Sequence, residues 1–195
     1  CFIRMFFAQA AAALTILGRW RGSRIGSREV EASTRAIAAQ GGVLTARDYC
    51  ISLHHWNEIA RSMGRFHQEY DILLTPVLAG PVPRIGETGP SRWQRQGLDL
   101  IQSLGLSGVL SRAGTVERTA LVSIARMPFP QVANLTGQPA MSLPLHLGSD
   151  GLPCGVQCIA ALGGETTLFR LAGQLERAKP WFHDFPPLIR KASQS

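Results

Sequence analysis

Few side chains in this 195-residue chain have the type and spacing that chemistry requires. Cys154 and Cys158 lie near His146, but a strand would hold the two cysteines about 13 Å apart, too far to share a metal ion or form a disulfide. His54 and His55 are adjacent, so on a helix they point about 100° apart and cannot form an i, i+4 metal pair. We therefore expect no metal site and no cofactor.

Nucleophilic catalysis has equally little support. A nucleophile elbow requires Gly-x-Ser-x-Gly, and the nearest run, Gly105 to Gly108, lacks that spacing. Motifs for dinucleotides and triphosphates are missing as well. A lysine base must be buried to lower its pKa toward neutrality, whereas Lys179 follows the last predicted helix and Lys191 lies in a polar tail. These are the only two lysines, so we expect no catalytic residue within the chain.

Composition and charge indicate a globular protein rather than a disordered or fibrous one. Hydrophobic residues make up 45% of the chain and charged residues 17%, and the length is that of roughly one domain. The net charge of +7 comes from arginines at scattered positions, so we expect no nucleic acid partner. Four cysteines without the spacing of a disulfide framework favour a cytoplasmic location.

The first apolar run, from Met5 to Leu17, is shorter than the roughly 20 residues that span a bilayer. It also lacks the strong basic flank and cleavage site of a secretory signal. We therefore expect no membrane partner. The spacing predicts a core helix with one apolar face, formed by Phe2, Phe6, Ala10 and Leu14.

The elements that follow alternate between helix and strand. Residues 29–39 predict a short helix that stops at the glycine pair 41–42. Thr45 and Asp48 match a capping box, with Asp in place of Glu, at the start of an amphipathic helix of about 25 residues. The short apolar run 71–77 predicts a buried strand that leads into a loop, and residues 91–126 are predicted to be helical in pieces.

The last third of the chain predicts a hairpin and one more helix. Residues 140–145 and 155–160 have strand character and flank an Asp-Gly turn signal at 150–151, which indicates antiparallel pairing. Apolar residues then recur at helical spacing from Leu168 to Leu175, and Pro180 closes the helix.

The segment from Met127 to Trp181 carries more Asn, Gly, Pro and Gln than a hairpin requires. Residues 129–144 (FPQVANLTGQPAMSLP) and 150–157 (DGLPCGVQ) resemble the C-terminal block of the amidase signature family. Residues 165–181 resemble that family's last helix, and residues 70–76 one of its strands. The sequence is most similar to bacterial amidases of the 6-aminohexanoate cyclic dimer hydrolase type. The resemblance implies an α/β fold in which helices cover a mixed β-sheet.

The resemblance also implies a mechanism. A serine attacks the amide carbonyl, a second serine relays its proton to a lysine, and backbone amides of a Gly- and Ser-rich loop stabilise the oxyanion before water releases the acyl group. In the family these groups lie in the N-terminal half, and nothing in this chain matches them. We interpret residues 1–195 as a single incomplete domain, the C-terminal portion of an amidase with its N-terminal catalytic portion absent, and expect it to be inactive alone. Cys1, where Met would start translation, favours the same interpretation.

The matching block supplies the candidate site residues, either as structural groups or as part of a substrate pocket wall. A tight turn is expected around Gly137 and Pro139. The amides of Gln131 and Asn134 could bond to substrate, although bonds to neighbouring backbone are favoured, and Gln157 fits a satisfied core amide better than a ligand group. The candidates are Phe129, Gln131, Asn134, Gly137, Pro139 and Gln157.

The resemblance says less about the substrate and the partners of the enzyme than about its fold. In the glutamyl-tRNA amidotransferase branch of the family an acidic substrate-binding residue lies just before the equivalent of Phe129, whereas this chain has Arg126-Met127-Pro128, which weakens a glutamine-specific interpretation. We expect a small-molecule amide substrate for the full-length enzyme, with a homodimer possible.

Two alternatives remain: a non-catalytic binding or scaffold subunit whose partner supplies the nucleophile, and a basic nucleic-acid-binding module. A half-sheet with uncovered apolar faces is also expected to self-associate.

Overall fold

The computed structural model describes residues 1–26, 29–87, 91, 93, 96–97, 115–149 and 151–181. The chain forms two compact units. Unit 1 comprises Cys1–Arg61 and Pro83–Arg126, and unit 2 comprises Ser62–Val82 and Met127–Ser195. The helical pieces predicted between 98 and 114, the run from Gly105 to Gly108, Asp150 and Lys191 lie outside the described residues.

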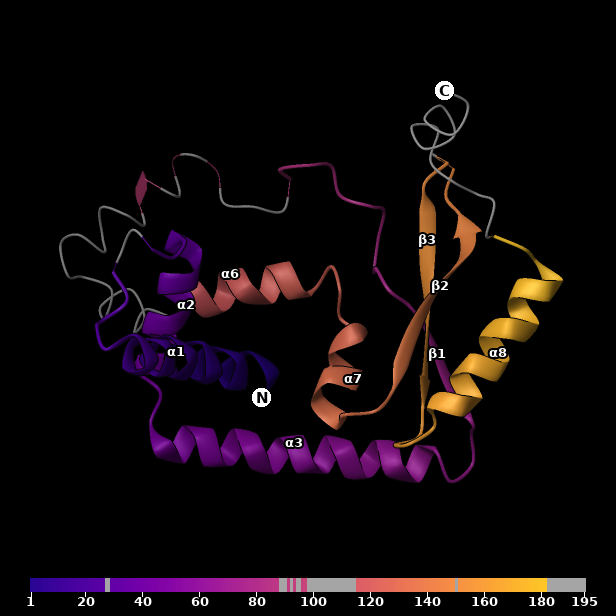
Figure 1. Ribbon diagram of the computed structural model, residues 1–195, viewed down its shortest axis with the longest axis horizontal. Helices are drawn as coiled ribbons and strands as arrows, with labels where there is room; N and C mark the ends of the chain where they lie inside the picture. Colours follow the sequence, from indigo (N-terminus) through magenta and orange to yellow (C-terminus); the bar gives the residue numbers. More distant parts are fainter. Residues whose placement is uncertain are drawn as a thin grey trace. The chain divides into compact units, whose positions relative to one another are not determined.

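Unit 1 contains helices α1 (Phe2–Arg21), α2 (Ala32–Gly42) and α6 (Thr115–Ile124), together with the first part of α3 (Ala46–Phe66). Helices α1 and α2 lie side by side (Figure 1). Gly41 makes this approach possible, because a Cβ atom there would lie 1.9 Å from the carbonyl oxygen of Phe7. Gly41, expected only as part of a helix end, is therefore also the point of contact between two helices.

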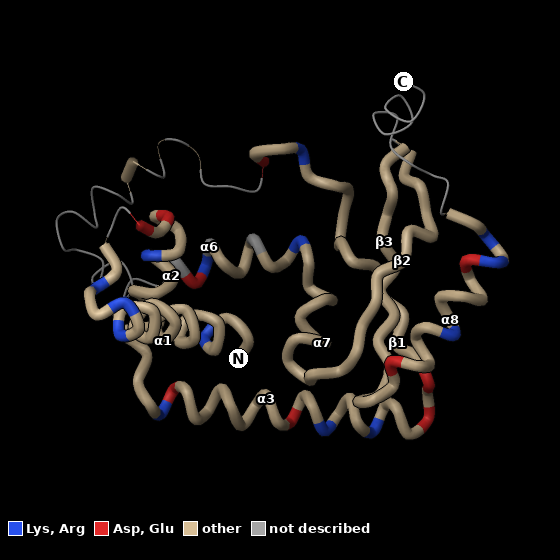
Figure 2. The backbone as a smooth tube through the Cα atoms, in the orientation of Figure 1, with Lys and Arg blue, Asp and Glu red and all other residues tan. Residues whose placement is uncertain are grey.

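The buried side of α1 differs from the predicted one. Met5 and Phe7 are the buried residues, whereas Phe6 is 47% exposed, so the prediction that Phe6 belongs to the core is wrong. The reason is that α2 packs through Gly41 against the side of α1 that carries Phe7 and Ala11. Basic residues lie near both ends of α1 and no acidic residue lies on it (Figure 2).

Helix α1 is also longer than the apolar run that suggested it. It continues from Phe2 to Arg21, and by length and composition alone it could cross a membrane, the only helix within the described ranges that meets this test. A core helix or a signal sequence passes the same test, so the result is weak evidence by itself.

Helix α3 begins as predicted. The hydroxyl of Thr45 accepts a hydrogen bond from the Asp48 backbone N–H at 3.1 Å, and the Asp48 carboxylate accepts one from the Thr45 N–H at 3.1 Å. This reciprocal pair confirms the capping box. The predicted apolar face is not buried, however, since Tyr49 and Leu53 are 39% and 41% exposed.

Unit 2 is built on a three-stranded antiparallel sheet of β1 (Ile72–Pro76), β2 (Ala140–Leu147) and β3 (Pro153–Ala160) in the order β1-β3-β2. The predicted hairpin is confirmed as β2 and β3. Its turn contains Gly151 with a φ of 74°, a left-handed conformation that suits glycine. The β2–β3 register shifts between Leu143 and His146, where Pro144 cannot donate a ladder hydrogen bond.

Helices cover both faces of this sheet (Figure 1). On one face α8 (Glu165–Ala178) brings Leu168 against Cys158 and Ala160, and these three side chains form a buried apolar cluster. The short helix α7 (Pro130–Thr136) lies on the opposite side. The α/β class expected from the sequence is confirmed, and the pairings among the described strands are antiparallel.

Candidate functional site

The candidate residues begin at the entry to α7. Phe129 is its N-cap and Pro130 occupies the first turn, where a missing N–H is harmless. The helix ends at Gly137, whose φ of 70° and ψ of 13° are left-handed and whose N–H donates to the carbonyl oxygen of Ala133 at 2.9 Å. Gly137 therefore turns the chain out of α7 toward Pro139 and β2, as the sequence predicted.

Gln138, which sequence reasoning did not single out, holds this turn against the sheet. Its Nε2 donates to the carbonyl oxygen of Ala160 at 3.2 Å, and the Ala160 N–H donates to the carbonyl oxygen of Pro139 at 3.1 Å. Its Oε1 lies 2.8 Å from the hydroxyl of Thr136 at the end of α7. The turn is thus joined both to α7 and to the end of β3.

Three polar side chains cross one face of the sheet in register. Gln157 on β3 is the partner of Thr75 on β1 and of Ser142 on β2. Directly paired residues of antiparallel strands project to the same face, and neighbours along a strand project to opposite faces. Thr75, Gln157 and Ser142 therefore form a polar row on the face opposite Cys158 and Ala160.

Gln157 is the buried centre of this polar row, with 6% of its surface exposed. Its Nε2 donates to the hydroxyl of Thr75 at 3.3 Å and to the carbonyl oxygen of Phe129 at 3.4 Å. The structure thus brings Gln157 and Phe129 together, and one side chain connects β1, β3 and the entry to α7.

Gly155 leaves space beside the polar row. It lies two residues before Gln157 on the same face of β3, and a Cβ atom there would be 2.6 Å from the Ser142 hydroxyl and 3.0 Å from a methyl group of Val77. Any larger residue would displace both neighbours. The sequence did not identify Thr75, Ser142 and Gly155 as a group. They lie on the same face of the sheet as Gln157, and this can be recognised only when the register between the strands is known.

The two remaining polar candidates, Gln131 and Asn134, lie on α7. Within the described residues, neither side chain forms a hydrogen bond with Gln157. Gln131 donates from Nε2 to the carbonyl oxygen of Met127 at 3.0 Å, a local backbone bond. Asn134 is exposed, and its side chain makes no hydrogen bond within the part of the chain that the structure describes.

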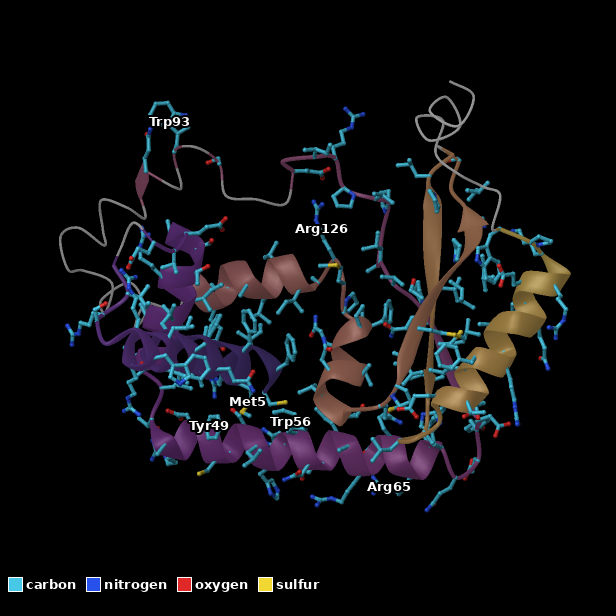
Figure 3. All side chains as sticks on the ribbon, viewed as in Figure 1. Met5, Tyr49, Trp56, Arg65, Trp93 and Arg126 are labelled. Carbon is cyan, nitrogen blue, oxygen red and sulfur yellow. The ribbon has the colours of Figure 1, made fainter. Side chains whose placement is uncertain are left out.

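Arg126, which stands just before the matching block, is paired rather than free. Both of its terminal nitrogens lie 3.1 Å from Oε1 of Glu87, and Figure 3 marks its position after the end of α6. The Arg84 backbone N–H and then the Arg126 guanidinium stabilise the Glu87 carboxylate and lower its pKa below the ordinary range. Glu87 therefore offsets the charge of Arg126.

The polar row can form hydrogen bonds but cannot supply a base. Its members are two hydroxyls and a carboxamide, all neutral. Lys179 is exposed, and its Nζ donates to the carbonyl oxygen of Leu145 at 2.7 Å. Burial raises the pKa of the nearby Cys158 thiol and so keeps it from the reactive thiolate form. Within the described ranges no group of three or more His, Cys, Asp or Glu could hold a metal.

Comparison with known proteins gives one consistent result. The family model described as Amidase matches residues 7–169. The chain is 34% identical over 157 residues to "Putative amidase AmiB2" of Mycobacterium tuberculosis (strain CDC 1551 / Oshkosh), a match that covers 80% of this chain and 29% of that protein. It is 31% identical over 164 residues to "6-aminohexanoate-cyclic-dimer hydrolase" of Paenarthrobacter ureafaciens, with 83% and 30% covered.

Among solved structures, "Structure of 6-aminohexanoate cyclic dimer hydrolase" superposes with a TM-score of 0.74 at 26% identity. The superposition covers 97% of this chain and 37% of that one. The chain therefore spans between 29% and 37% of the length of these relatives.

Proposed function

The chain belongs to the amidase family, and from this premise we propose that it forms part of a hydrolase that cleaves the carbon–nitrogen bond of a small-molecule carboxylic amide. The observation that carries the proposal is the match over residues 7–169, which includes the whole segment from Phe129 to Gln157. We place the reaction in the cytoplasm, because all four cysteines are free thiols.

Within this hydrolase we assign a non-catalytic part to residues 1–195. A serine nucleophile, a relaying serine and a lysine base must come from residues outside this chain. Neither lysine of the chain suits the role: Lys179 is exposed and bonded to a backbone carbonyl, and Lys191 follows in the C-terminal segment. Buried, desolvated surroundings are what lower the pKa of a lysine enough to act as a base.

The reaction that the assembled enzyme would perform is a two-step acyl transfer. The serine oxygen forms a bond to the amide carbonyl carbon while its proton passes through the second serine to the lysine. The amine leaves with a proton, and water then cleaves the acyl–serine ester to give the carboxylic acid. In this scheme the polar row and the α7 entry form a neutral wall beside the substrate, and no step passes through a side chain of this chain.

The test has two arms. The 195-residue chain alone is incubated with 6-aminohexanoate cyclic dimer and with an amide of p-nitroaniline, and is treated with a fluorophosphonate that labels activated serines. We expect no amine release above buffer and no label. The chain is then co-expressed with the part of the Paenarthrobacter ureafaciens hydrolase that it does not match. We expect co-purification and amide hydrolysis that the part alone lacks.

Either arm can contradict the proposal. Labelling or hydrolysis by the chain alone would overturn its non-catalytic role. A stable complex that labels with the fluorophosphonate but hydrolyses neither amide would overturn the assignment of amide hydrolysis and favour the scaffold alternative.

A further inference from the structure

One side of helix α3 carries a thiol and an imidazole at the spacing of a metal-binding pair. Cys50 and His54 are four residues apart, and both are exposed. Residues at i and i+4 lie one turn apart on the same side of a helix, and zinc sites use this spacing to take two ligands from one helix. The expectation that the chain has no metal site rested on the hairpin cysteines and on the adjacent histidines, and it did not pair Cys50 with His54. We name these two residues the α3 pair.

The α3 pair lies on the outward side of its helix. Ser52 is two residues from each member, which places it about 200° round the helix from both, and Ser52 is only 2% exposed. The exposed neighbours on the side of the pair are polar, and they are Arg47, Asn57 and Arg61. A polar side of an amphipathic helix faces solvent. The accessibility of the pair therefore does not depend on what covers the exposed apolar residues of α3.

The helix holds the two ligands at a fixed spacing. Helix α3 is one continuous element from Ala46 to Phe66, and the capping box of Thr45 and Asp48 fixes its start. On a helix the Cβ atoms at i and i+4 are about 5–6 Å apart. One metal ion can bridge that separation, because zinc binds thiolate sulfur at about 2.3 Å and imidazole nitrogen at about 2.0–2.1 Å. Rotation of the two side chains is enough, so the backbone does not have to move.

Glu58 lies one turn further along the same side and contacts the imidazole. Its Oε1 is 3.4 Å from Nε2 of His54, and both side chains are more than half exposed. A carboxylate at that position favours the tautomer with the proton on Nε2, which leaves the lone pair on Nδ1 for a metal ion. Histidines that bind metal usually donate their other ring N–H to a carboxylate or a carbonyl in this way. Glu58 is thus a positioning residue for His54 rather than a ligand.

We propose that Cys50 and His54 bind a thiophilic divalent metal ion, with Zn²⁺ the expected one. The Cys50 thiol loses its proton to solvent and binds through sulfur, and the neutral His54 ring binds through nitrogen. Zinc accepts this donor set, whereas Mg²⁺ and Ca²⁺ take oxygen ligands. Because the described residues contain no group of three or more His, Cys, Asp or Glu that could hold a metal, water fills the remaining positions of the zinc tetrahedron. The inference does not rest on amide hydrolysis.

Cys154 and His146 form the competing thiol and imidazole pair. They are register partners on β3 and β2, but the register shifts between Leu143 and His146. Cys154 is half-buried, and the ion pairs among the described residues give His146 no carboxylate partner. This pair therefore lacks the orientation that Glu58 gives to His54, and it serves as the comparison in the test.

The test is a titration of the full 195-residue chain with Cd²⁺ after a chelator has removed bound metal. Cd²⁺ takes the same ligands as Zn²⁺ and adds a charge-transfer absorption in the ultraviolet when a thiolate binds it. Every variant carries Cys1→Ser, because an N-terminal amine and its thiol can chelate metal on their own. We expect the absorption to saturate at one Cd²⁺ per chain and Zn²⁺ to abolish it by competition.

Five variants of that chain locate the site. Cys50→Ser should abolish the absorption. Glu58→Gln should lower the affinity for Cd²⁺ about tenfold, since loss of a group that orients a metal ligand typically costs about 10–100-fold, and His54→Ala should lower it further. His55→Ala removes an imidazole that points about 100° away, and Cys154→Ser removes the thiol of the competing pair. These two controls should bind Cd²⁺ as the parent does, and circular dichroism should show the same helix content in every variant.

Alkylation gives a second readout that a structural role would not change. Zn²⁺ should slow the reaction of Cys50 with iodoacetamide, and His54→Ala should remove that protection. Five results would overturn the proposal: no thiolate absorption with Cd²⁺, absorption that Cys50→Ser leaves unchanged, equal affinity of the parent and His54→Ala, and an equal loss in His55→Ala. The fifth is a metal-dependent dimer with one ion for two chains, because a second copy rather than water would then complete the site.

Discussion

Gln157 donates from its side-chain Nε2 to the backbone carbonyl oxygen of Phe129, 3.4 Å away, and so connects the middle strand of the sheet to the N-cap residue of α7. The same nitrogen lies 3.3 Å from the hydroxyl of Thr75. One buried carboxamide thus joins three segments that are distant in the sequence, and its loss should affect all three.

Gln157→Leu keeps the volume of the side chain but leaves the Phe129 carbonyl and the Thr75 hydroxyl without this donor. Because an unsatisfied buried polar group costs about 1–3 kcal/mol, we expect the free energy of unfolding in urea to fall by that amount. Gln131→Leu is the control, since its bond to Met127 is exposed, and should change stability by no more than about 0.5 kcal/mol. Equal effects would contradict a special role for Gln157.

Gly41 and Gly42 are adjacent but should respond differently to alanine. A Cβ atom at Gly41 would lie 1.9 Å from the Phe7 carbonyl oxygen, whereas at Gly42 it would meet nothing within 4 Å. Overpacking typically costs about 1–3 kcal/mol or more, so Gly41→Ala should lower the melting temperature. Gly42→Ala should leave it unchanged or raise it, because alanine restricts the unfolded chain. Similar melting curves for both variants would disprove the close contact between α1 and α2.

The capping box predicts a pH dependence. The Thr45 hydroxyl, and next its backbone N–H, hold the pKa of Asp48 below the ordinary value. A lowered pKa adds stability that is complete above the ordinary value of about 4 and is lost as the pH falls through the lower folded pKa. The stability difference between the parent chain and Asp48→Ala should therefore be constant from neutral to mildly acidic pH and shrink below pH about 4.

Thr45→Ala provides the check on that interpretation. Because the variant loses the Thr45 hydroxyl but keeps the backbone N–H that also bonds the Asp48 carboxylate, the acid dependence that Asp48 contributes should become smaller without disappearing. Chemical denaturation at a series of pH values measures the free energy of unfolding of each variant. If its acid dependence is unchanged in Thr45→Ala, a group other than the capping box is responsible.

The cysteines should differ in reactivity. Cys1 and Cys50 are exposed, whereas Cys158 is fully buried with a raised thiol pKa. Since the thiolate is the reactive form, we expect iodoacetamide to modify Cys1 and Cys50 first and Cys158 only after denaturant is added. Mass spectrometry of peptides at successive times measures this order. Early modification of Cys158 would mean that α8 opens readily from the sheet.

Local patterns predicted the elements whose signals lie within a few residues. The Thr45–Asp48 capping box, the hairpin around Gly151 and the helix containing Leu168 all depend on spacing that a single segment contains. Their bonds and turns follow from the types of neighbouring residues, which is why the sequence was sufficient.

Features that depend on distant segments were not predictable in the same way. The face of α1 was assigned from periodicity alone, but Gly41 of another helix decides which side is buried. Similarly, the polar row requires the register between Thr75 and Gln157, which no local pattern contains. The candidate residues from Phe129 to Gln157 could be named from the resemblance, whereas their contacts could not.

The strand order has a consequence for how the protein is made. Thr75 and Gln157 are 82 residues apart, and the strand that joins the sheet together, β3, is translated after both of its neighbours. At about 5–20 residues per second, the ribosome needs on the order of 4–16 s to extend the chain from β1 to its partner. Among the strands that the structure describes, β1 pairs only with β3, so this pairing cannot form until β3 emerges.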